Sequence, residues 1–164
     1  MKIAITGSHG VGKTTIFNNY RLLQEMGLLE DYVFLDETPR KIVKQKGKRI
    51  DEMDEEEFWE FEEQLYEEQV QKETQVNNFI SDRCLLDIVA YSDFYFMDRF
   101  EKEFLEKYQK EYKFIYVPVA FELHPDEETR NNSDENYQSL IDQRIYQLLN
   151  DYNLFFKIKE GENG

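Results

Sequence analysis

The sequence predicts an α/β fold in which a parallel sheet is covered by helices on both faces. Two observations carry this prediction: five short apolar segments alternate with segments of helical periodicity, and no repeat or low-complexity linker separates them. Strands joined by helices run parallel, because a parallel connection needs a long crossover. At 164 residues the chain is long enough for one sizeable core. We therefore expect one domain over residues 1–164.

The expected strands are short and apolar, as buried strands of a parallel sheet are. They occupy residues 2–6, 32–35, 78–81, 114–118 and 154–158. Apolar residues at helical spacing fill the intervals between them. The expected helices cover residues 12–26, 40–47 and 54–74, a segment from Leu85, and residues 98–110 and 134–150. The apolar helix faces expected from this spacing include Leu22, Leu23 and Leu140.

A polar stretch separates the fourth expected strand from the last helix. Residues 123–136 contain Pro125 and the polar run from Arg130 to Asp134, a composition that is typical of a loop. We expect a mobile lid here. Asp134 is the expected N-cap of the helix that follows, because an Asp side chain accepts hydrogen bonds from the free N–H groups of a first helical turn.

The first strand is followed by a glycine-rich loop. Residues 7–14 read Gly-Ser-His-Gly-Val-Gly-Lys-Thr, which is the G-x-x-x-x-G-K-T phosphate loop in the strand–loop–helix setting that it requires. Backbone N–H groups and the start of the helix would bind the phosphates of ATP, Lys13 would contact the terminal phosphates, and the Thr14 hydroxyl would bind Mg²⁺. The expected nucleotide-binding residues are Gly7, His9, Gly10, Val11, Gly12, Lys13, Thr14 and Thr15.

Charged residues follow the second and third expected strands, where ligands of open α/β sheets collect. Asp36 and Glu37 follow the second strand, and either could orient or deprotonate an acceptor hydroxyl. Asp82 is placed to orient Mg²⁺, directly or through water, and Arg83 to bind phosphate or align the acceptor. Arg130 could close over the phosphates from the lid. Each residue taken alone also fits a surface ion pair or a solvated loop.

The long helix expected at residues 54–74 is strongly acidic and carries several aromatic residues. Its spacing fits a solvated acidic face opposite an aromatic core stripe. It also fits a pocket for a planar base, in which a ring stacks on the base and an amide pairs with its edge. The residues that would line such a pocket are Trp59, Gln64, Tyr66 and Gln69.

Composition limits the partners. The net charge of −15 and the pI near 4.6 argue against stable binding to nucleic acid or to anionic membrane. No apolar run is long enough to span a bilayer and no N-terminal targeting signal is recognisable, so we expect a cytoplasmic protein. The single Cys84 cannot form an intramolecular disulfide and is expected to be a buried apolar residue. The sequence leaves open whether the protein forms a homodimer.

These motifs together resemble the P-loop nucleoside and nucleotide kinase group, which includes thymidylate kinases, deoxynucleoside kinases and the ATPase-like family of nicotinamide riboside kinases. The resemblance rests on the phosphate loop, on Glu37 after the second strand, on the Ser81–Tyr91 segment with its Asp-Arg and Leu-Asp pairs, and on Arg130. It implies a five-stranded sheet in the order 2-3-1-4-5. It also implies acceptor contacts from Glu37, Arg40, Arg83 and Asp87, beside those listed for the long helix.

The chain departs from the family pattern in two places. Thr38 separates Glu37 from Pro39, where thymidylate kinases carry a Glu-Pro pair, and the lid holds one arginine where many nucleotide kinases have several. A nucleoside hydroxyl and a nucleoside monophosphate therefore both stay open as the phosphate acceptor.

Three functions fit the sequence. The first is an ATP- and Mg²⁺-dependent kinase of a small nucleoside or nucleoside monophosphate, in which Lys13, Asp36, Glu37, Asp82, Arg83 and Arg130 carry the catalysis. The second is a kinase of a modified base in DNA, against which the surface charge argues. The third is a regulatory nucleotide-binding ATPase. No N-K-x-D guanine-specificity sequence is present, and the third strand ends in Asp-Arg where a ring-forming motor ATPase has two adjacent acids.

Overall fold

The computed structural model describes residues 1–35, 54–96, 102–119 and 132–160. Within these ranges the chain forms five strands and five helices. In chain order they are β1 Lys2–Thr6, α1 Lys13–Glu25, β2 Val33–Leu35, α3 Glu55–Gln75, β3 Phe79–Asp82, α4 Leu85–Phe96, α5 Lys102–Gln109, β4 Tyr112–Tyr116, α6 Asn132–Asp151 and β5 Phe155–Ile158. The helix expected at residues 40–47 lies outside the described residues.

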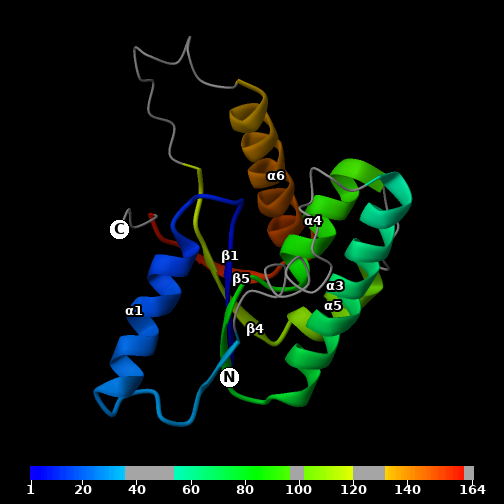
Figure 1. The fold of residues 1–164 in the computed structure, drawn as a ribbon. Coiled ribbons are helices and arrows are strands. Elements are labelled where there is room, and N and C mark those ends of the chain that lie inside the picture. The colour runs from blue at the N-terminus through cyan, green and yellow to red at the C-terminus, as the bar shows by residue number, and fades with distance from the viewer. Residues whose placement is uncertain (36–53, 97–101, 120–131, 161–164) are drawn as a thin grey trace, which may run out of the picture.

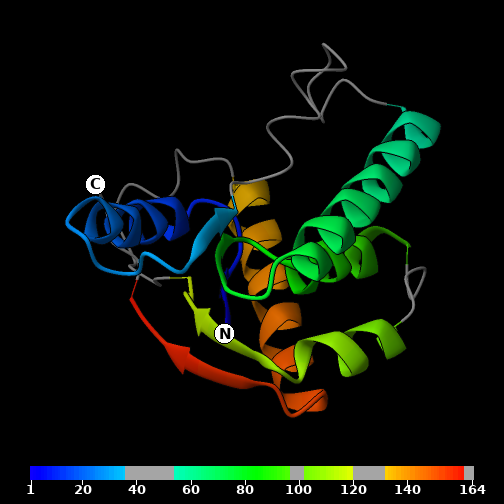
Figure 2. The same cartoon turned by 90° about the horizontal axis from the view of Figure 1, so that it is seen from below.

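All five strands belong to one parallel sheet in the order β2-β3-β1-β4-β5. The predicted fold class is confirmed, and so is the strand order that the family resemblance implied. Figure 1 shows α1 on one face of the sheet and α3, α4, α5 and α6 on the other. Seen from below in Figure 2, the first turns of α3 project away from the sheet.

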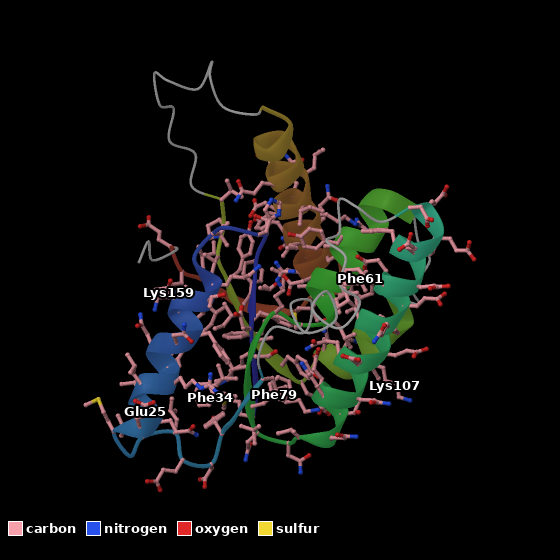
Figure 3. All side chains as sticks on the ribbon, viewed as in Figure 1. Glu25, Phe34, Phe61, Phe79, Lys107 and Lys159 are labelled. Carbon is pink, nitrogen blue, oxygen red and sulfur yellow. The ribbon has the colours of Figure 1, made fainter. Side chains whose placement is uncertain are left out.

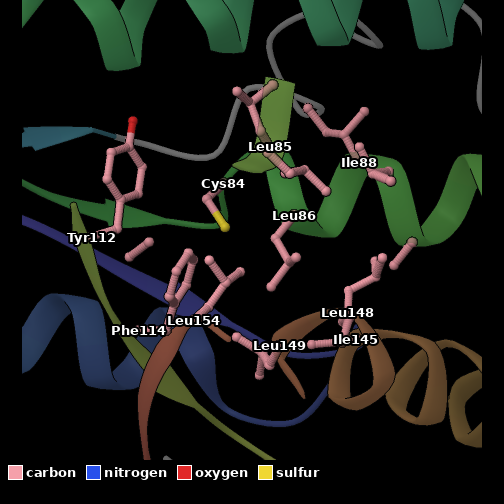
Figure 4. Packing of buried hydrophobic residues seen from close by; sticks show 14 of the residues in the cluster. Cys84, Leu85, Leu86, Ile88, Tyr112, Phe114, Ile145, Leu148, Leu149 and Leu154 are labelled. Carbon is pink, nitrogen blue, oxygen red and sulfur yellow. The ribbon is translucent and has the colours of Figure 1, made fainter. Parts of the chain in front are cut away.

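The two faces of the sheet carry separate apolar clusters. On the α1 side, Ile5 and Ile80 of the sheet pack against Ile16 and Phe17. The Phe34 ring lies 5.5 Å from that of Phe17. Figure 3 shows Phe34 between α1 and the sheet, on the side away from Phe61. The larger cluster lies under the other four helices. At its centre, residues of α4, α6 and the sheet interdigitate, as Figure 4 shows for Cys84, Leu85, Leu86, Phe114, Leu148, Leu149 and Leu154. Cys84 is 0% exposed, so its predicted burial is confirmed.

The acidic helix α3 begins where the sequence predicted. Asp54 is its N-cap, and its side chain accepts a 2.8 Å hydrogen bond from the Glu57 N–H. Three glutamates occupy the first turn, where the positive end of the helix dipole stabilises them. The start of α3 is thus stabilised locally by its own side chains.

The last helix begins earlier than predicted. α6 starts at Asn132, so Asp134 lies inside the helix and is not its N-cap, and residues 132–136 of the predicted lid are helical. Nothing in the sequence from Asn132 to Asp151 opposes this, because the segment contains no Gly or Pro. The rest of the predicted lid, residues 123–131, lies outside the described residues.

Three leucines expected on buried helix faces are exposed. Leu22, Leu23 and Leu140 expose 55%, 36% and 47% of their surface. On α1 the buried residues are Lys13, Ile16 and Phe17, because only the first turns of this helix pack against the sheet. Within the described residues, no helix is long and apolar enough to cross a membrane.

Candidate functional site

The glycine-rich loop joins β1 to α1 at the carboxyl end of the central strand. Gly10 and Gly12 adopt φ angles of 73° and 96°, in the left-handed region that glycine enters without a Cβ clash. A Cβ on Gly7 would lie 2.6 Å from the carbonyl oxygen of Val117, so this position also requires glycine. Three glycines therefore fix a tight loop at the N-terminus of α1, the geometry that phosphate binding needs.

Lys13 lies folded over this loop. Its ammonium group donates hydrogen bonds to the carbonyl oxygens of Gly7 and Ser8, and its side chain is only 5% exposed. The positive charge of Lys13 therefore lies inside the phosphate loop. Thr15 follows in the first turn of α1, and Val11 is buried in the cluster beneath. All eight residues predicted to bind the nucleotide belong to this loop or to the first turn of α1.

Thr14 and Asp82 bring the loop into contact with the next strand. The Thr14 hydroxyl donates a 2.8 Å hydrogen bond to Oδ2 of Asp82, which ends β3 beside Ile5 of β1 and is 3% exposed. Hydroxyl and carboxylate oxygens are the ligands that Mg²⁺ prefers, and Mg²⁺ usually completes its shell with phosphate oxygens and water. The described residues contain no group of three or more metal-binding side chains. Thr14 and Asp82 could supply two oxygen ligands to a Mg²⁺ ion.

Helix α4 holds the beginning of the loop through Asp87. Its Oδ1 accepts hydrogen bonds from the Thr6 hydroxyl at 3.0 Å and the Gly7 N–H at 3.1 Å. Its Oδ2 accepts from the N–H of Cys84 at 3.0 Å and from the thiol at 3.3 Å. Burial raises the pKa of the Cys84 thiol, so the thiol keeps its proton. Both oxygens of Asp87, which is 1% exposed, are thus used within the protein. The structure gives Asp87 a part in loop positioning, and its predicted contact with the acceptor stays a prediction.

Two helices hold the middle of the loop at His9. The His9 N–H donates a 2.9 Å hydrogen bond to the hydroxyl of Tyr91, and the ring nitrogen Nδ1 lies 3.0 Å from the same hydroxyl. From α6, the Gln138 side chain donates to the His9 carbonyl oxygen. The His9 N–H is therefore directed at Tyr91.

Arg83 follows Asp82 in a conformation that is unusual for a side-chain-bearing residue. Its φ is 74°, and its N–H donates a 3.0 Å hydrogen bond to the Ile5 carbonyl oxygen. The Ser81 hydroxyl donates to the Arg83 carbonyl oxygen. The guanidinium carbon lies 5.7 Å from the centre of the Tyr91 ring, within the range of a cation–π contact. Left-handed residues of this kind are held by their surroundings and often occur at functional sites.

Glu62 of α3 is a candidate that the sequence reasoning missed. It is 5% exposed, and its buried Oε2 has no hydrogen-bond partner among the described residues. Burial raises its pKa to about 7, although the positive charge of Arg83 opposes this shift. A buried oxygen without a partner is rare, because it loses its hydration without a replacement. The available signal was its position beside Phe61 and three residues before Leu65, within the apolar stripe of the helix.

The residues predicted to form a base pocket lie in different surroundings, and the pocket stays a prediction. Trp59 lines an open cavity of about 690 Å³, and Glu55, Glu56, Glu60 and Glu63 line it too among the residues that the structure describes. Gln64 donates a 3.3 Å hydrogen bond to Glu68 of its own helix. Tyr66 packs against the larger core cluster. Gln69 is 3% exposed and hydrogen-bonds the side chain of Glu73, so it belongs to the interior.

Glu73 ties α3 to the start of α4. Its Oε2 accepts a 3.0 Å hydrogen bond from the N–H of Leu85, the first residue of α4. Glu73 is 0% exposed, and burial raises its pKa to about 7 despite hydrogen bonds from Gln69 and Tyr112. The carboxyl thus contacts the start of α4, which follows Asp82 and Arg83 closely along the chain.

The remaining predicted site residues lie outside the described residues: Asp36, Glu37, Arg40 and Arg130.

Comparison with known proteins supports the same fold. A family model described as an AAA domain matches residues 2–161. A search of curated proteins gives no match. Among solved structures, deoxyadenosine kinase from M. mycoides with bound dATP is similar at 19% identity and a TM-score of 0.58, over 100% of this chain and 92% of that chain.

Two further solved structures are similar. Thymidylate kinase from Ehrlichia chaffeensis has 14% identity and a TM-score of 0.58, over 100% of this chain and 88% of that chain. Shikimate kinase from Bacteroides thetaiotaomicron has 19% identity and a TM-score of 0.50, over 98% of this chain and 86% of that chain. At these identities the likeness is one of fold. The chain has the three-layer fold of the P-loop nucleoside and nucleotide kinase group.

Proposed function

The chain belongs to the AAA domain family, and we propose that this member is an ATP- and Mg²⁺-dependent kinase of a small nucleoside or nucleoside monophosphate. One observation carries the proposal above the others. Asp82 is hydrogen-bonded to Thr14 of the phosphate loop, and the next residue along the chain is Arg83. A metal-orienting carboxylate and a cation for the acceptor thus follow one another beside the loop that binds the donor.

The donor half of the reaction depends on the loop. Lys13 would exchange its hydrogen bonds to the Gly7 and Ser8 carbonyls for the terminal phosphates, and backbone N–H groups of the loop from Gly10 onward would bind phosphate oxygens. Thr14 and Asp82 would hold Mg²⁺, which neutralises phosphate charge when bound.

The acceptor half depends on Arg83 and on the strand end beside it. Arg83 would bind an acceptor phosphate or align the acceptor hydroxyl. Asp36 or Glu37 would orient or deprotonate that hydroxyl, and Arg130 would close over the transferring group from the lid. Glu62, buried near Arg83, offers an oxygen for an N–H or O–H donor of the acceptor. Trp59, near the start of α3, would lie at the edge of the acceptor site.

The similar structures bear on the acceptor class. Two are kinases named for a deoxynucleoside and a nucleotide, deoxyadenosine and thymidylate, and the third is a shikimate kinase. They support a small-molecule acceptor, and the nucleoside class is the one that the Asp82–Arg83 turn and the aromatic α3 favour. A cytoplasmic enzyme of nucleotide metabolism, formed by one domain with a lid, fits this proposal.

The test is formation of ADP from ATP in the presence of Mg²⁺ and a panel of acceptors. The panel contains deoxynucleosides, ribonucleosides, their monophosphates, shikimate and hydroxymethylated duplex DNA. We expect one nucleoside or monophosphate to raise turnover well above the rate without acceptor, and Lys13→Ala to abolish the increase. Stimulation by the duplex DNA alone would favour a DNA-base kinase. ADP formation that no acceptor changes would favour the regulatory ATPase.

A further inference from the structure

Tyr91 lies between the phosphate loop and Arg83. Its hydroxyl contacts His9 of the loop at two atoms, the backbone nitrogen at 2.9 Å and Nδ1 at 3.0 Å. The face of the same ring carries the Arg83 guanidinium, whose carbon is 5.7 Å from the ring centre. A single side chain thus contacts the donor loop with its polar end and the acceptor-side arginine with its ring.

Two features make this contact more than incidental. A tyrosine hydroxyl has one hydrogen and two lone pairs, so it can serve both His9 atoms in either tautomer of the imidazole. Tyr91 also follows Asp87 by four residues on α4, which puts both side chains on one face of that helix. Asp87 holds Gly7 and Tyr91 holds His9, so one helix face contacts two points of the loop.

Asp87 and Tyr91 differ in the second group that each side chain contacts. Asp87 accepts a hydrogen bond from the N–H of Cys84, the residue directly before α4. Tyr91 reaches Arg83, whose backbone is held in the left-handed region and bonded to the end of β1. The Arg83 side chain thus stacks on a ring whose hydroxyl contacts the loop at His9.

We propose that Tyr91 is a positioning residue that joins the phosphate loop to Arg83, so that nucleotide bound at the loop fixes the Arg83 guanidinium for the acceptor. The inference rests on the proposed function and adds the order in which nucleotide binding fixes the residues of the site. Occupation of the loop fixes His9, His9 fixes the Tyr91 ring, and the ring limits the movement of Arg83. The coupling is reciprocal, because a link that lets the nucleotide restrain Arg83 lets an acceptor on Arg83 strengthen nucleotide binding.

The test follows the reactivity of the Arg83 side chain toward phenylglyoxal, read by peptide mass spectrometry with and without MgADP. Two variants separate the contacts. Tyr91→Phe keeps the ring under Arg83 and removes the hydroxyl from His9. Gln138→Ala removes a different contact to His9 and leaves Tyr91 intact. Arg21 is an internal control, because its guanidinium carbon lies 5.9 Å from the Phe17 ring, a similar stacking that does not involve Tyr91.

In the wild type and in Gln138→Ala we expect MgADP to slow modification of Arg83 by about fivefold or more and to leave Arg21 unchanged. In Tyr91→Phe we expect the slowing to disappear, while calorimetry still detects ADP binding and circular dichroism a folded protein. Equal slowing in Tyr91→Phe would overturn the inference, since ADP would then shield Arg83 directly. Slowing that is absent from the wild type despite ADP binding would overturn it too. Failure of the wild type to bind ADP would instead refute the proposed function, and the inference with it.

Discussion

The Thr14 hydroxyl donates a 2.8 Å hydrogen bond to Oδ2 of Asp82. The contact joins the first turn of α1 to the end of β3, and it brings together the two oxygen groups assigned to Mg²⁺. Two different parts of the chain, 68 positions apart, meet here because β1 and β3 are neighbours in the sheet.

The hydroxyl of Thr14 is expected to be essential for the use of Mg²⁺. Thr14→Ala removes it, and we expect the Mg²⁺ concentration at half-maximal turnover to rise by about tenfold or more. Thr14→Ser keeps the hydroxyl and serves as the control, with a Mg²⁺ dependence close to that of the wild type. A Thr14→Ala variant with unchanged Mg²⁺ dependence would remove Thr14 from the metal site.

Lys13 is expected to matter for turnover and little for stability. Its ammonium group donates hydrogen bonds to the Gly7 and Ser8 carbonyls of its own loop, which is a local contact. Lys13→Ala should lower ATP turnover by about a hundredfold or more, with a melting temperature within about 3 °C of the wild type. Lys157→Ala, at an exposed lysine of β5, should change neither quantity. A Lys13→Ala protein that unfolds by circular dichroism would contradict this assignment.

Asp87 is expected to have a large structural effect. In the wild type, the N–H groups of Gly7 and Cys84 both donate to the Asp87 carboxylate. Asp87→Asn replaces one carboxylate oxygen by an NH₂ group, which is itself a donor and faces these N–H groups. We expect it to lower the free energy of unfolding by about 2–4 kcal/mol and to weaken ADP binding, because the loop loses its anchor. Urea unfolding and calorimetry measure the two effects. Asp151→Asn, an exposed change at the end of α6, is the control and should be nearly neutral. Equal stability of the two variants would refute the anchoring role.

Stability is expected to fall as the pH rises toward and past neutrality. Burial raises the pKa of both Glu62 and Glu73 from 4.5 to about 7. A carboxyl with a raised pKa contributes stability that is complete below about pH 4.5 and is lost as the pH rises through 7. The loss is up to about 3 kcal/mol for each group.

Neutral variants separate this effect from the general charge of the protein. Between pH 5 and pH 8, Glu62→Gln and Glu73→Gln should each reduce the pH dependence of the unfolding free energy, and the double variant most of all. Glu67→Gln, at an exposed position of α3, should leave it unchanged. A double variant whose stability falls with pH as steeply as that of the wild type would show that these two carboxyls ionise normally.

The fold could be predicted from the sequence because its signals are local. Apolar runs mark buried strands, and the phosphate loop marks the junction of β1 and α1. The predicted ends of strands and helices were less accurate where two sequence signals conflict. β4 begins at Tyr112, two residues before the predicted start, and alternates buried and exposed residues where a continuous apolar run was sought. Asp134 was expected to cap α6, but Asn132 already lies in the helix.

The roles of single side chains depend on contacts that spacing does not encode. Asp87 and Gln69 look like polar residues available to a ligand, but both are buried and hydrogen-bonded within the protein. Glu62 looks like one more charge on an acidic helix, but α3 turns it inward toward Arg83. Helical periodicity gives the face of a helix, and only the packing of α3 against α4 shows which of its carboxyls is buried.

The destination of the γ-phosphate tests the central claim most directly. The enzyme is incubated with γ-labelled ATP, Mg²⁺ and each member of the acceptor panel, and the labelled products are separated. We predict that the label appears on one nucleoside or nucleoside monophosphate, that the transfer requires Mg²⁺, and that Lys13→Ala abolishes it. Label that appears only as inorganic phosphate, with every acceptor, would contradict the assignment as a small-molecule kinase.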